Sequence, residues 1–507
     1  MNSLLDCFAA AATRVPLRKT LLGAAAALAI GSLTIPVYSP GAFAQPASQS
    51  VTIPGAPNGV PSFADVIDRV KGSVVSVRVR IADRSDEGRR GRGMHGMPPN
   101  VEPGDPLGRF FRRFGDDGFG QRQRPREAMA QGSGFIISAD GFVVTNNHVI
   151  QNATEVVLGL DDGRSVPARV VGADEKTDLA LLKITQDGQY PFTQWAEGAP
   201  RVGDWVLAVG NPFGLGGTVT AGIVSARGRD IGAGPYDDFI QIDAPVNRGN
   251  SGGPTFDLHG RVVGVNTAIY SPSGGSVGIG FAIPATVARD VISQLRENGQ
   301  VSRGYIGVQI QPITPEIAES MGLSRRDGAL VADTQANTPA AKAGLRAGDI
   351  ITSVNGQRIQ TARDLSRQIA GLGPQREARI GFLREGREQV VAVTLEALPD
   401  GSADARGGMD RRGPSQPPQD GEGARLGLRL APGADGVEVA QVEPGSPAER
   451  NGLREGDVIL EVAGKAVRRP ADVASAVRDA RSSQRRTILL RVRSSEGIRF
   501  VALPATS

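Results

Sequence analysis

The sequence predicts a mainly β protein, with antiparallel barrels or sandwiches in its first half and two copies of a small module in its second. Its length of 507 residues is enough for roughly three domains. From Gly132 to Ile283, short β-type runs follow one another at regular spacing, separated by Gly or Asp-Gly turns. That pattern is typical of antiparallel barrels and sandwiches. An internal repeat further along the chain indicates the two modules.

The strands predicted in the first half are short apolar runs. The first, Ser73–Val79, alternates apolar and polar residues, as a half-buried strand does. Five further runs have β character: Gly134–Ile137, Phe142–Thr145, Glu155–Leu158, Trp205–Val209 and Arg261–Val265. Residues 285–298 are predicted to form one amphipathic helix that closes this unit.

The second half of the chain contains one segment twice. Pro339–Ile351 recurs as Pro447–Ile459, and the shift, 447 − 339, is 108 positions. Each copy continues into a short turn, Val354–Gly356 in the first and Val462–Gly464 in the second. The sequences of these turns, Val-Asn-Gly and Val-Ala-Gly, predict a tight hairpin in each module.

A helix and a linker complete the prediction for the repeated modules. Helix-like stretches lie near residues 362–371 and 470–480. Residues 399–423 are rich in Gly, Pro, Asp, Arg and Gln, which is the composition of a linker. We therefore expect two small folded modules joined by a flexible segment.

The N-terminal 44 residues have the three parts of a secretory signal. A basic region precedes the apolar stretch Leu21–Ile35, and Ala42–Ala44 fits the small-x-small cleavage rule, so we expect the cut before Gln45. The basic residues are Arg14, Arg18 and Lys19. The alternative is an uncleaved anchor, since apolar character runs on to Val37; the cleavage signature favours removal.

Cysteine content and charge narrow the class of protein further. The single cysteine, Cys7, lies in the signal, so the mature chain has no thiol, no disulfide and no cysteine-based zinc site. Export without disulfides fits a bacterial periplasm. Cleavage removes three basic groups and one acidic group, which takes the net charge from +4 to +2. That near-neutral charge gives no argument for nucleic acid, and we expect no cofactor and no metal.

Gly249–Pro254, with the sequence Gly-Asn-Ser-Gly-Gly-Pro, is the most informative stretch of the chain. It places Ser251 between glycines, where its hydroxyl can be exposed. The backbone N–H groups of Gly249 and Ser251 can then point to one place in space. A serine nucleophile needs such an accessible oxygen, together with two donors for the oxyanion formed after attack.

The chain has three histidines, and they lie in different contexts. His148 follows the predicted strand Phe142–Thr145, at a strand end where a barrel presents side chains to a cleft. His259 lies in a predicted β-turn. His95 lies in a Met-His-Met cluster that has soft ligands for copper(I), although its Gly and Pro neighbours favour a solvated loop.

Asp178 is the best candidate for the third member of a catalytic triad. A serine–histidine pair needs a group that fixes the imidazole tautomer and stabilises its positive charge. Asp178 directly precedes an apolar strand, so we expect it to be partly buried and oriented. The chain order His148, Asp178, Ser251 is the order of chymotrypsin-type barrels and not that of subtilisins or α/β-hydrolases.

Three motifs make the resemblance to the HtrA (Deg, or protease Do) family specific. They are Thr145–Ile150 (TNNHVI), Thr177–Lys183 (TDLALLK) and Asn247–Pro254 (NRGNSGGP). The resemblance covers nearly all of residues 60–503. It implies a chymotrypsin-like double β-barrel protease domain followed by two PDZ domains.

The resemblance also implies roles for individual residues. Ser251 would be the nucleophile, His148 the general base and then acid, and Asp178 the residue that orients the histidine. The oxyanion hole would be formed by the amides of Gly249, Asn250 and Ser251. The resemblance further implies a substrate pocket for small aliphatic residues, formed by Val246, Gly278, Ile279 and Gly280.

Peptide binding and regulation are implied in the same way. The carboxylate of a bound peptide would be held by the loop Tyr305, Ile306, Gly307 and Val308, with Arg425–Leu428 as its counterpart in the second module. Segments 227–238, 244–250 and 270–279 match the regulatory and specificity loops of the family. Their glycines give them freedom to change between ordered and disordered states.

The arginine-rich segment 84–128 matches the long inserted loop of the family. Its Phe110–Phe114 is similar to the part that reaches a neighbouring subunit, whereas the alternative is a solvated basic loop. Unlike some family members, this chain has no cysteine pair there. The resemblance implies a homotrimer or higher multiples of trimers and is compatible with peripheral membrane association.

These inferences combine into one domain plan and one expected function. The expected segments are a signal peptide at 1–44, a flexible lead at 45–60, a protease domain at 61–300, PDZ domains at 303–398 and 424–504, and a linker at 399–423. The expected function is ATP-independent endoproteolysis of unfolded or damaged exported proteins in the periplasm, activated by peptide C-termini. The alternatives are a peptide-binding chaperone with an idle protease domain, and a membrane-tethered signalling protease.

Overall fold

The structure is a computed structural model. It describes residues 62–81, 128–214, 217–247, 249–271, 275–399, 426–483 and 485–505. The signal, the flexible lead, nearly all of the inserted loop with His95, the linker and Arg425 lie outside the described residues.

Six antiparallel strands close into a first barrel. They are β1 (Val74–Ile81), β2 (Ala128–Ile136), β3 (Phe142–Thr145), β4 (Ala153–Gly159), β5 (Ser165–Asp174) and β6 (Leu179–Ile184). Their order around the barrel is β1-β2-β3-β6-β5-β4. Successive side chains of a strand point to opposite faces, so one set from each strand fills the barrel. A short helix, α3 (Asn147–Ile150), follows β3 directly.

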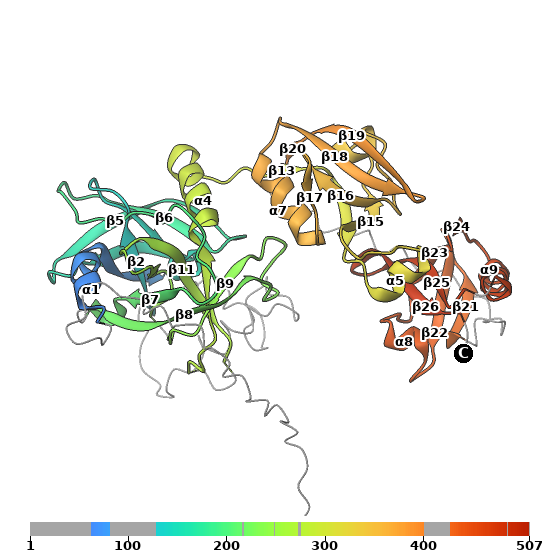
Figure 1. The fold of residues 1–507 in the computed structure, drawn as a ribbon, viewed down its shortest axis with the longest axis horizontal. Helices are drawn as coiled ribbons and strands as arrows, with labels where there is room; N and C mark the ends of the chain where they lie inside the picture. Colours follow the sequence, from blue (N-terminus) through green and yellow to red (C-terminus); the bar gives the residue numbers. More distant parts are fainter. Residues whose placement is uncertain are drawn as a thin grey trace, which may run out of the picture. The chain divides into compact units, whose positions relative to one another are not determined.

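A second barrel follows, with the same number of strands. They are β7 (Trp205–Gly210), β8 (Thr218–Arg229), β9 (Phe239–Ile242), β10 (Pro254–Phe256), β11 (Val262–Ile269) and β12 (Gly280–Pro284). The order is β10-β11-β12-β9-β8-β7. These barrels lie among the blue to green parts of Figure 1.

Helix α4 (Ala285–Asn298) closes the double barrel, as the sequence predicted. Its buried residues recur at helical spacing, which is why one face packs on β5, β6 and β11. It ends at Gly299, whose φ of 74° places it in the left-handed region that glycine adopts readily. A smaller helix, α1 (Ala64–Val70), precedes the first strand.

Both tryptophans of the chain lie in the barrels. The ring of Trp195 meets the ring of Phe135 edge-on, with centroids 5.4 Å apart. Trp205, at the start of β7, packs against Phe63 with centroids 5.5 Å apart. Trp205 keeps 40% of its surface exposed, whereas Trp195 lies against the core that includes Phe135.

The first repeated module is a six-strand antiparallel sheet with helices and a separate two-strand pair. Its elements are β13 (Gly304–Tyr305), β14 (Val308–Gln311), α5 (Pro315–Ser320), β15 (Ala329–Thr334), α6 (Pro339–Lys342), β16 (Ile350–Val354), β17 (Gln357–Arg358), α7 (Ala362–Leu372), β18 (Glu377–Arg384), β19 (Arg387–Thr394) and β20 (Glu396–Ala397). The order is β14-β15-β16-β18-β19, β17 pairs with β16, and the separate pair is formed by β13 and β20. Helix α7 begins with a capping box between Thr361 and Asp364.

The second module repeats this plan. Its elements are β21 (Leu428–Pro432), β22 (Val437–Val442), α8 (Pro447–Arg450), β23 (Val458–Val462), β24 (Lys465–Ala466), α9 (Pro470–Ser482), β25 (Thr487–Ser494) and β26 (Gly497–Pro504). The order is β21-β22-β23-β25-β26, with β24 on β23. Helices α7 and α9 and both predicted hairpins are confirmed, with Asn355 and Ala463 at positive φ of 51° in the two turns.

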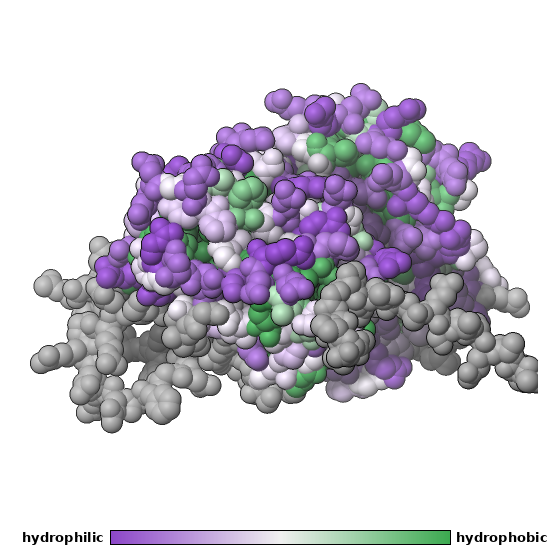
Figure 2. Space-filling view, turned by 60° about the vertical axis from the view of Figure 1, so that its left-hand side comes forward, coloured by the Kyte–Doolittle hydropathy of each residue, from purple (hydrophilic) through white to green (hydrophobic). Residues whose placement is uncertain are grey.

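Apolar residues fill cores in the barrels and in each module, and one further buried cluster contains residues of both modules. The larger barrel core includes Phe135, Phe256 and Leu295, all fully buried. On the face in Figure 2 the described surface is mostly hydrophilic, with apolar residues scattered between hydrophilic ones. Scattered apolar residues are normal for a globular surface.

Candidate active site

His148 and Asp178 come together because β3 and β6 are neighbouring antiparallel strands. Thr145 at the end of β3 lies opposite Ala180 near the start of β6, so α3 and the turn before β6 meet at one barrel edge. His148 Nδ1 lies 2.7 Å from Asp178 Oδ2, and the His148 backbone N–H donates to Oδ1 at 3.0 Å. These two contacts hold the imidazole with Nδ1 facing the carboxylate, so that Nε2 faces away from it.

The backbone of Asp178 has an unusual conformation that aims its carboxylate. Its φ is +56°, in the left-handed region that few non-glycine residues adopt. Its carbonyl oxygen accepts hydrogen bonds from the Asn146 side chain at 2.8 Å and from the Asn147 backbone N–H at 3.1 Å. The Asn-Asn pair before His148 therefore fixes the aspartate that contacts the histidine.

Ser251 reaches this pair from the second barrel through Thr267. The Ser251 hydroxyl donates a long hydrogen bond of 3.4 Å to the Thr267 carbonyl oxygen. The Thr267 hydroxyl donates to Asp178 Oδ2 at 2.7 Å. Asp178 Oδ2 therefore accepts from both His148 and Thr267, and Thr267 connects Asp178 to Ser251.

Sequence reasoning missed Thr267. It is buried in the middle of β11, whose other residues are mostly apolar, so its only sequence signal is a hydroxyl inside an apolar strand. Many such threonines bond only to the local backbone. Thr267 reaches Asp178 because of the register of β11 in the folded barrel, which cannot be seen in the sequence.

Two carbonyl groups of the turn around Ser251 are held by hydrogen bonds. The Asn250 carbonyl accepts from the Gly253 N–H at 3.0 Å, and the Ser251 carbonyl accepts from the Ser133 N–H at 2.9 Å. Because a trans peptide points its N–H and C=O in opposite directions, the Ser251 N–H points away from Gly253. In the described part of the chain, the N–H groups of Gly249 and Ser251 have no acceptor.

Asn250 differs from its neighbours in this turn. Its backbone N–H donates to the Asn247 carbonyl at 3.1 Å, so in this conformation it is not available to a ligand. Its side chain is buried, and its Oδ1 has no hydrogen-bond partner among the described residues. The structure thus leaves two of the three predicted amides available as donors.

A small cavity of about 40 Å³ lies beside Asp178. Its wall includes Thr267 and the loop residues Tyr236 and Asp237. Asp237 is buried and accepts two backbone N–H groups, from Ile231 at 3.0 Å and Ala233 at 2.9 Å. Burial raises the pKa of Asp237, and these two hydrogen bonds act in the opposite direction. Asp237 therefore organises a loop that borders Asp178.

The four residues predicted to line the substrate pocket separate into two groups. Val246 is buried, and a Cβ added to Gly280 would lie 3.1 Å from its side chain and 3.3 Å from that of Ile242. Ile279 instead packs against the larger barrel core, which includes Phe281. Gly278 has a φ of +79°, next to Ile279.

The predicted carboxylate-binding loop joins β13 to β14. Within the described residues the N–H groups of Ile306 and Gly307 have no acceptor, as a loop that binds an anion requires. Gly307 has a φ of +80°, and an added Cβ would lie 2.2 Å from Thr338 Cβ. The second module repeats this at Gly427, with a φ of +76° against Ser446.

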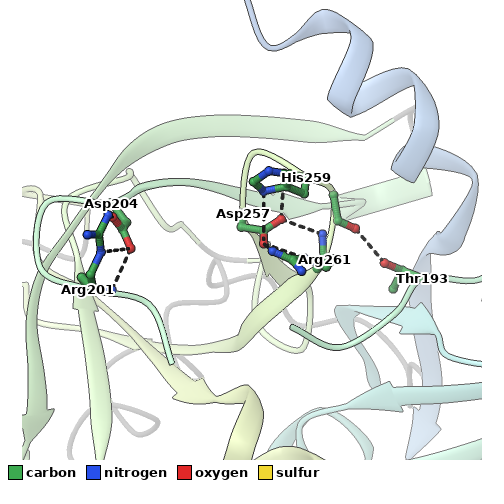
Figure 3. Close-up of polar contacts among 7 residues, drawn as sticks. Thr193, Arg201, Asp204, Asp257, His259 and Arg261 are labelled. Atoms are coloured by element: carbon green, nitrogen blue, oxygen red, sulfur yellow. Dashed lines mark hydrogen bonds and ion pairs between the residues drawn. The ribbon is translucent and has the colours of Figure 1, made fainter. Parts of the chain in front are cut away.

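His259 lies in a turn, as predicted, and Figure 3 shows its surroundings. Asp257 Oδ1 accepts from the backbone N–H groups of His259 at 2.8 Å and Arg261 at 2.9 Å. Arg261 also donates to Asp257 Oδ2, and Thr193 donates to the Gly260 carbonyl. The His259 side chain is 75% exposed, so this histidine belongs to a surface turn.

Comparison with known proteins agrees with this geometry. Residues 132–265 match a family described as "Trypsin-like peptidase domain", and residues 304–395 and 438–492 each match one described as "PDZ domain". A solved structure described as "HtrA-type protease AlgW with tripeptide" has 36% identity and a TM-score of 0.54, over 68% of this chain and 99% of that chain.

Two relatives are similar over most of their length. Both are named "Probable periplasmic serine endoprotease DegP-like". The protein of Rhizobium meliloti (strain 1021) is 47% identical over 472 residues, which are 88% of this chain and 92% of the relative. The protein of Brucella suis biovar 1 (strain 1330) is 46% identical over 511 residues, which are 96% of this chain and 98% of the relative.

Fold and matches together define a serine endopeptidase, with a trypsin-like double barrel followed by two PDZ domains. The predicted fold class is confirmed. More narrowly, the chain belongs to the HtrA/Deg family, as its motifs indicated. Among the described helices, none has the length and apolar character needed to cross a membrane.

Proposed function

We propose that Ser251, His148 and Asp178 form the catalytic triad of this endopeptidase. The observation that carries the proposal is the pair of 2.7 Å contacts on Asp178 Oδ2, from His148 Nδ1 and from Thr267. Ser251 attacks the scissile carbonyl while His148 accepts its proton. His148 then gives that proton to the leaving amine, and Asp178 stabilises the imidazolium between the two steps.

The amides of Gly249 and Ser251 form the oxyanion hole in this proposal. Both N–H groups lack an acceptor among the described residues, and the Ser251 N–H points away from Gly253, which the Asn250 carbonyl faces. Such donors stabilise the negative charge of the tetrahedral intermediate most when they are already in place. The Asn250 N–H is not a donor in this proposal, because it is hydrogen-bonded to the Asn247 carbonyl.

The proposed substrates are unfolded or damaged exported proteins. An endopeptidase that needs an extended segment in its cleft selects chains without stable structure. The cluster of Val246, Ile242 and Gly280 supports a pocket for a small aliphatic residue before the cut. Peptide hydrolysis by a triad needs no nucleotide, so the activity is expected to be independent of ATP.

We further propose that a peptide C-terminus bound to the first PDZ domain activates the protease. Arg367 of α7 pairs with Asp238 at 2.6 Å, in the loop that Asp237 organises. Arg303, next to β13, makes a buried two-point pair with Asp174 at 2.6 and 2.8 Å. Asp174 also accepts from Thr177, the neighbour of Asp178. Helix α7 packs on β13, the strand that leads into the predicted carboxylate-binding loop. Both contacts therefore connect the surroundings of that loop to the surroundings of Asp178.

Export to the periplasm, cleavage after Ala44 and assembly into trimers complete the proposal. The names of the relatives support the periplasm. Holding unfolded chains without cutting them, a chaperone activity, would use the same PDZ domains. The trimer is tested by light scattering on the mature protein, and the cleavage site by N-terminal sequencing.

The deciding experiment compares casein degradation by the protein lacking residues 1–44 with degradation by its Ser251→Ala variant. Removal of the nucleophile is expected to lower turnover by several orders of magnitude. If neither protein cuts casein when C-terminal peptides are added, the protease proposal fails. Suppression of aggregation would then be the activity to measure.

A small ester separates activation from substrate binding. We expect the activating peptide to increase ester turnover, because peptide binding increases the population of the form in which the oxyanion hole is ordered. Equal ester turnover with and without peptide would contradict this mechanism.

A further inference from the structure

Ser133 lies fully buried behind the turn that carries Ser251. Its hydroxyl donates to the Gly249 carbonyl at 2.5 Å and accepts from the Asn211 backbone N–H at 2.8 Å. Its own backbone N–H donates to the Ser251 carbonyl at 2.9 Å. One residue of β2 therefore holds two carbonyl groups of this turn, on either side of Asn250.

Glycines allow β2 to approach the turn so closely. A Cβ added to Gly252 would lie 2.3 Å from the Ser133 carbonyl oxygen, and one on Gly132 would lie 3.2 Å from the Ser251 carbonyl oxygen. Any larger residue at position 252 would push the two backbones apart. The Ser133 side chain reaches Gly249 because Gly132 and Gly252 place no side chain of their own between β2 and the turn.

The Ser133 hydroxyl restrains the peptide unit that directly follows the free Gly249 amide. Its hydrogen bond to the Gly249 carbonyl holds the Gly249–Asn250 peptide plane, whose N–H belongs to Asn250, and so limits the ψ rotation of Gly249. Gly249 has a φ of +94°, and its backbone would move easily without such a bond, because it has no side chain. The Asn211 N–H fills an acceptor position on the same hydroxyl, which leaves the hydroxyl proton for Gly249.

We propose that Ser133 is a positioning residue that pre-organises the oxyanion hole through the Gly249 carbonyl. This inference rests on the proposed role of the Gly249 and Ser251 amides. Ser133 touches neither substrate nor the reacting atoms. Its effect is therefore on the stabilisation of the tetrahedral intermediate and not on ground-state binding of the peptide.

The chain provides a matched control in Ser76. It lies directly opposite Ser133 in the β1–β2 register and is equally buried. Its hydroxyl has no hydrogen-bond partner among the described residues. Ser76→Ala therefore removes the same atom from the same barrel without changing the turn of Ser251.

The test measures kcat and KM for a short peptide substrate in the full mature chain, with activating peptide present. We expect Ser133→Ala to lower kcat by about 10- to 100-fold, less than the loss of a whole oxyanion donor. KM should change by less than about 3-fold, because ground-state contacts remain. Ser76→Ala should match the wild type, and Ser133→Cys, with a weaker donor, should fall between.

A peptide boronic acid gives a second readout that a merely structural role would not change. The Ser251 oxygen bonds to boron, its proton passes to His148, and a hydroxyl of the tetrahedral adduct occupies the oxyanion hole. Ser133→Ala is expected to weaken boronate binding by about the factor lost in kcat. Binding of the matching peptide carboxamide, which forms no adduct, should not change.

The outcomes separate this inference from the proposed function. If wild type neither cleaves the peptide nor binds the boronate better than Ser251→Ala does, the proposed function fails, and this inference with it. If the wild type cleaves the peptide and binds the boronate, but Ser133→Ala has the same kcat as the wild type, the inference alone is overturned. It is also overturned if carboxamide binding falls as much as kcat. Should Ser133→Ala not fold, Ser133→Cys is judged by the same criteria.

Discussion

The two PDZ modules have the same sheet order, and each has a buried aspartate at the equivalent position of the repeat. The two aspartates differ in the hydrogen bonds that they accept from arginine side chains. In the first module Asp349 is 1% exposed and receives two hydrogen bonds of 2.7 Å from Arg384, at the end of β18. In the second module Asp457 is 4% exposed, and β25 ends instead in Ser494. The nearest guanidinium there, of Arg499, lies 3.9 Å away.

The comparison separates the hydrogen bonds that both modules make around this aspartate from those that one module makes. Both aspartates accept the backbone N–H three residues earlier, so the turn is built in the same way twice. The carbonyls of Gly344 and Gly452 each accept from an arginine, although the arginine comes from β18 in one module and β26 in the other. Among the described residues, only the first module adds a two-point guanidinium contact on the carboxylate, and we expect it to be the more stable of the two.

The largest effect is expected from Arg384→Met. It leaves the Asp349 carboxylate buried without a cation, which costs about 3–5 kcal/mol of the free energy of unfolding of the first module. Hydrogen exchange of the β16 and β18 amides in the full chain measures this. The matched change Arg499→Met should cost no more than about 1 kcal/mol in the second module. Equal losses in both modules would contradict the comparison.

Ser494→Arg should give the second module the two-point contact between a guanidinium and the buried carboxylate that Arg384 makes in the first. A charge-assisted hydrogen bond to Asp457, after the cost of ordering the side chain, should stabilise that module by about 1 kcal/mol. Ser494→Lys is the control, because an ammonium group cannot make the two-point contact. Hydrogen exchange of the β23 and β25 amides measures the stability of this module. An equal gain in stability for both variants would show that the two-point geometry of the contact is unimportant.

Ala463→Asn should give about 0.5–1 kcal/mol of stabilisation. Ala463 has a φ of +51°, a conformation that is costly for alanine and better tolerated by asparagine. In the first module Asn355 occupies this position, and its Oδ1 accepts the Arg379 N–H at 2.8 Å. The reverse change, Asn355→Ala, should destabilise the first module by a similar amount. Thermal unfolding of both variants checks the pair.

The smallest effect concerns pH in the second module. Burial raises the pKa of Asp457 above its ordinary value, which outweighs the Arg454 N–H and the arginine charges. The native state therefore holds this proton more tightly than the unfolded chain does. Stability should rise as pH falls through the folded pKa toward the unfolded value of about 3.9, and be lost again as pH rises.

Asp457→Asn is the control for that pH dependence. It removes the titrating group, so the variant should show no gain in second-module stability over the same acid range. Amide exchange corrected for its intrinsic pH dependence is the measurement. A gain that persists in the variant would assign it to another group.

Much of the fold and the candidate site of His148, Asp178 and Ser251 could be predicted, because the signals can be read along the chain. The Gly-Asn-Ser-Gly-Gly string and the repeated segment are continuous in sequence, and the order of the three residues needs no knowledge of their contacts. Thr267 and Ser133 could not be predicted, because the register of β11 and β2 in closed barrels determines what they contact. The contrast between Arg384 and Ser494 lies outside the repeated segment, so comparison of the copies missed it.

Because of where the two tryptophans lie, tryptophan fluorescence can be used to follow the double barrel separately from the PDZ modules. Trp195 and Trp205 both lie in the double barrel, and neither PDZ module contains one. Emission excited selectively through tryptophan therefore reports only the catalytic half, while amide exchange follows all three folded units. A denaturation curve recorded by fluorescence should be unchanged by Ser494→Arg or Ala463→Asn, unless the stability of a PDZ module is coupled to that of the barrels.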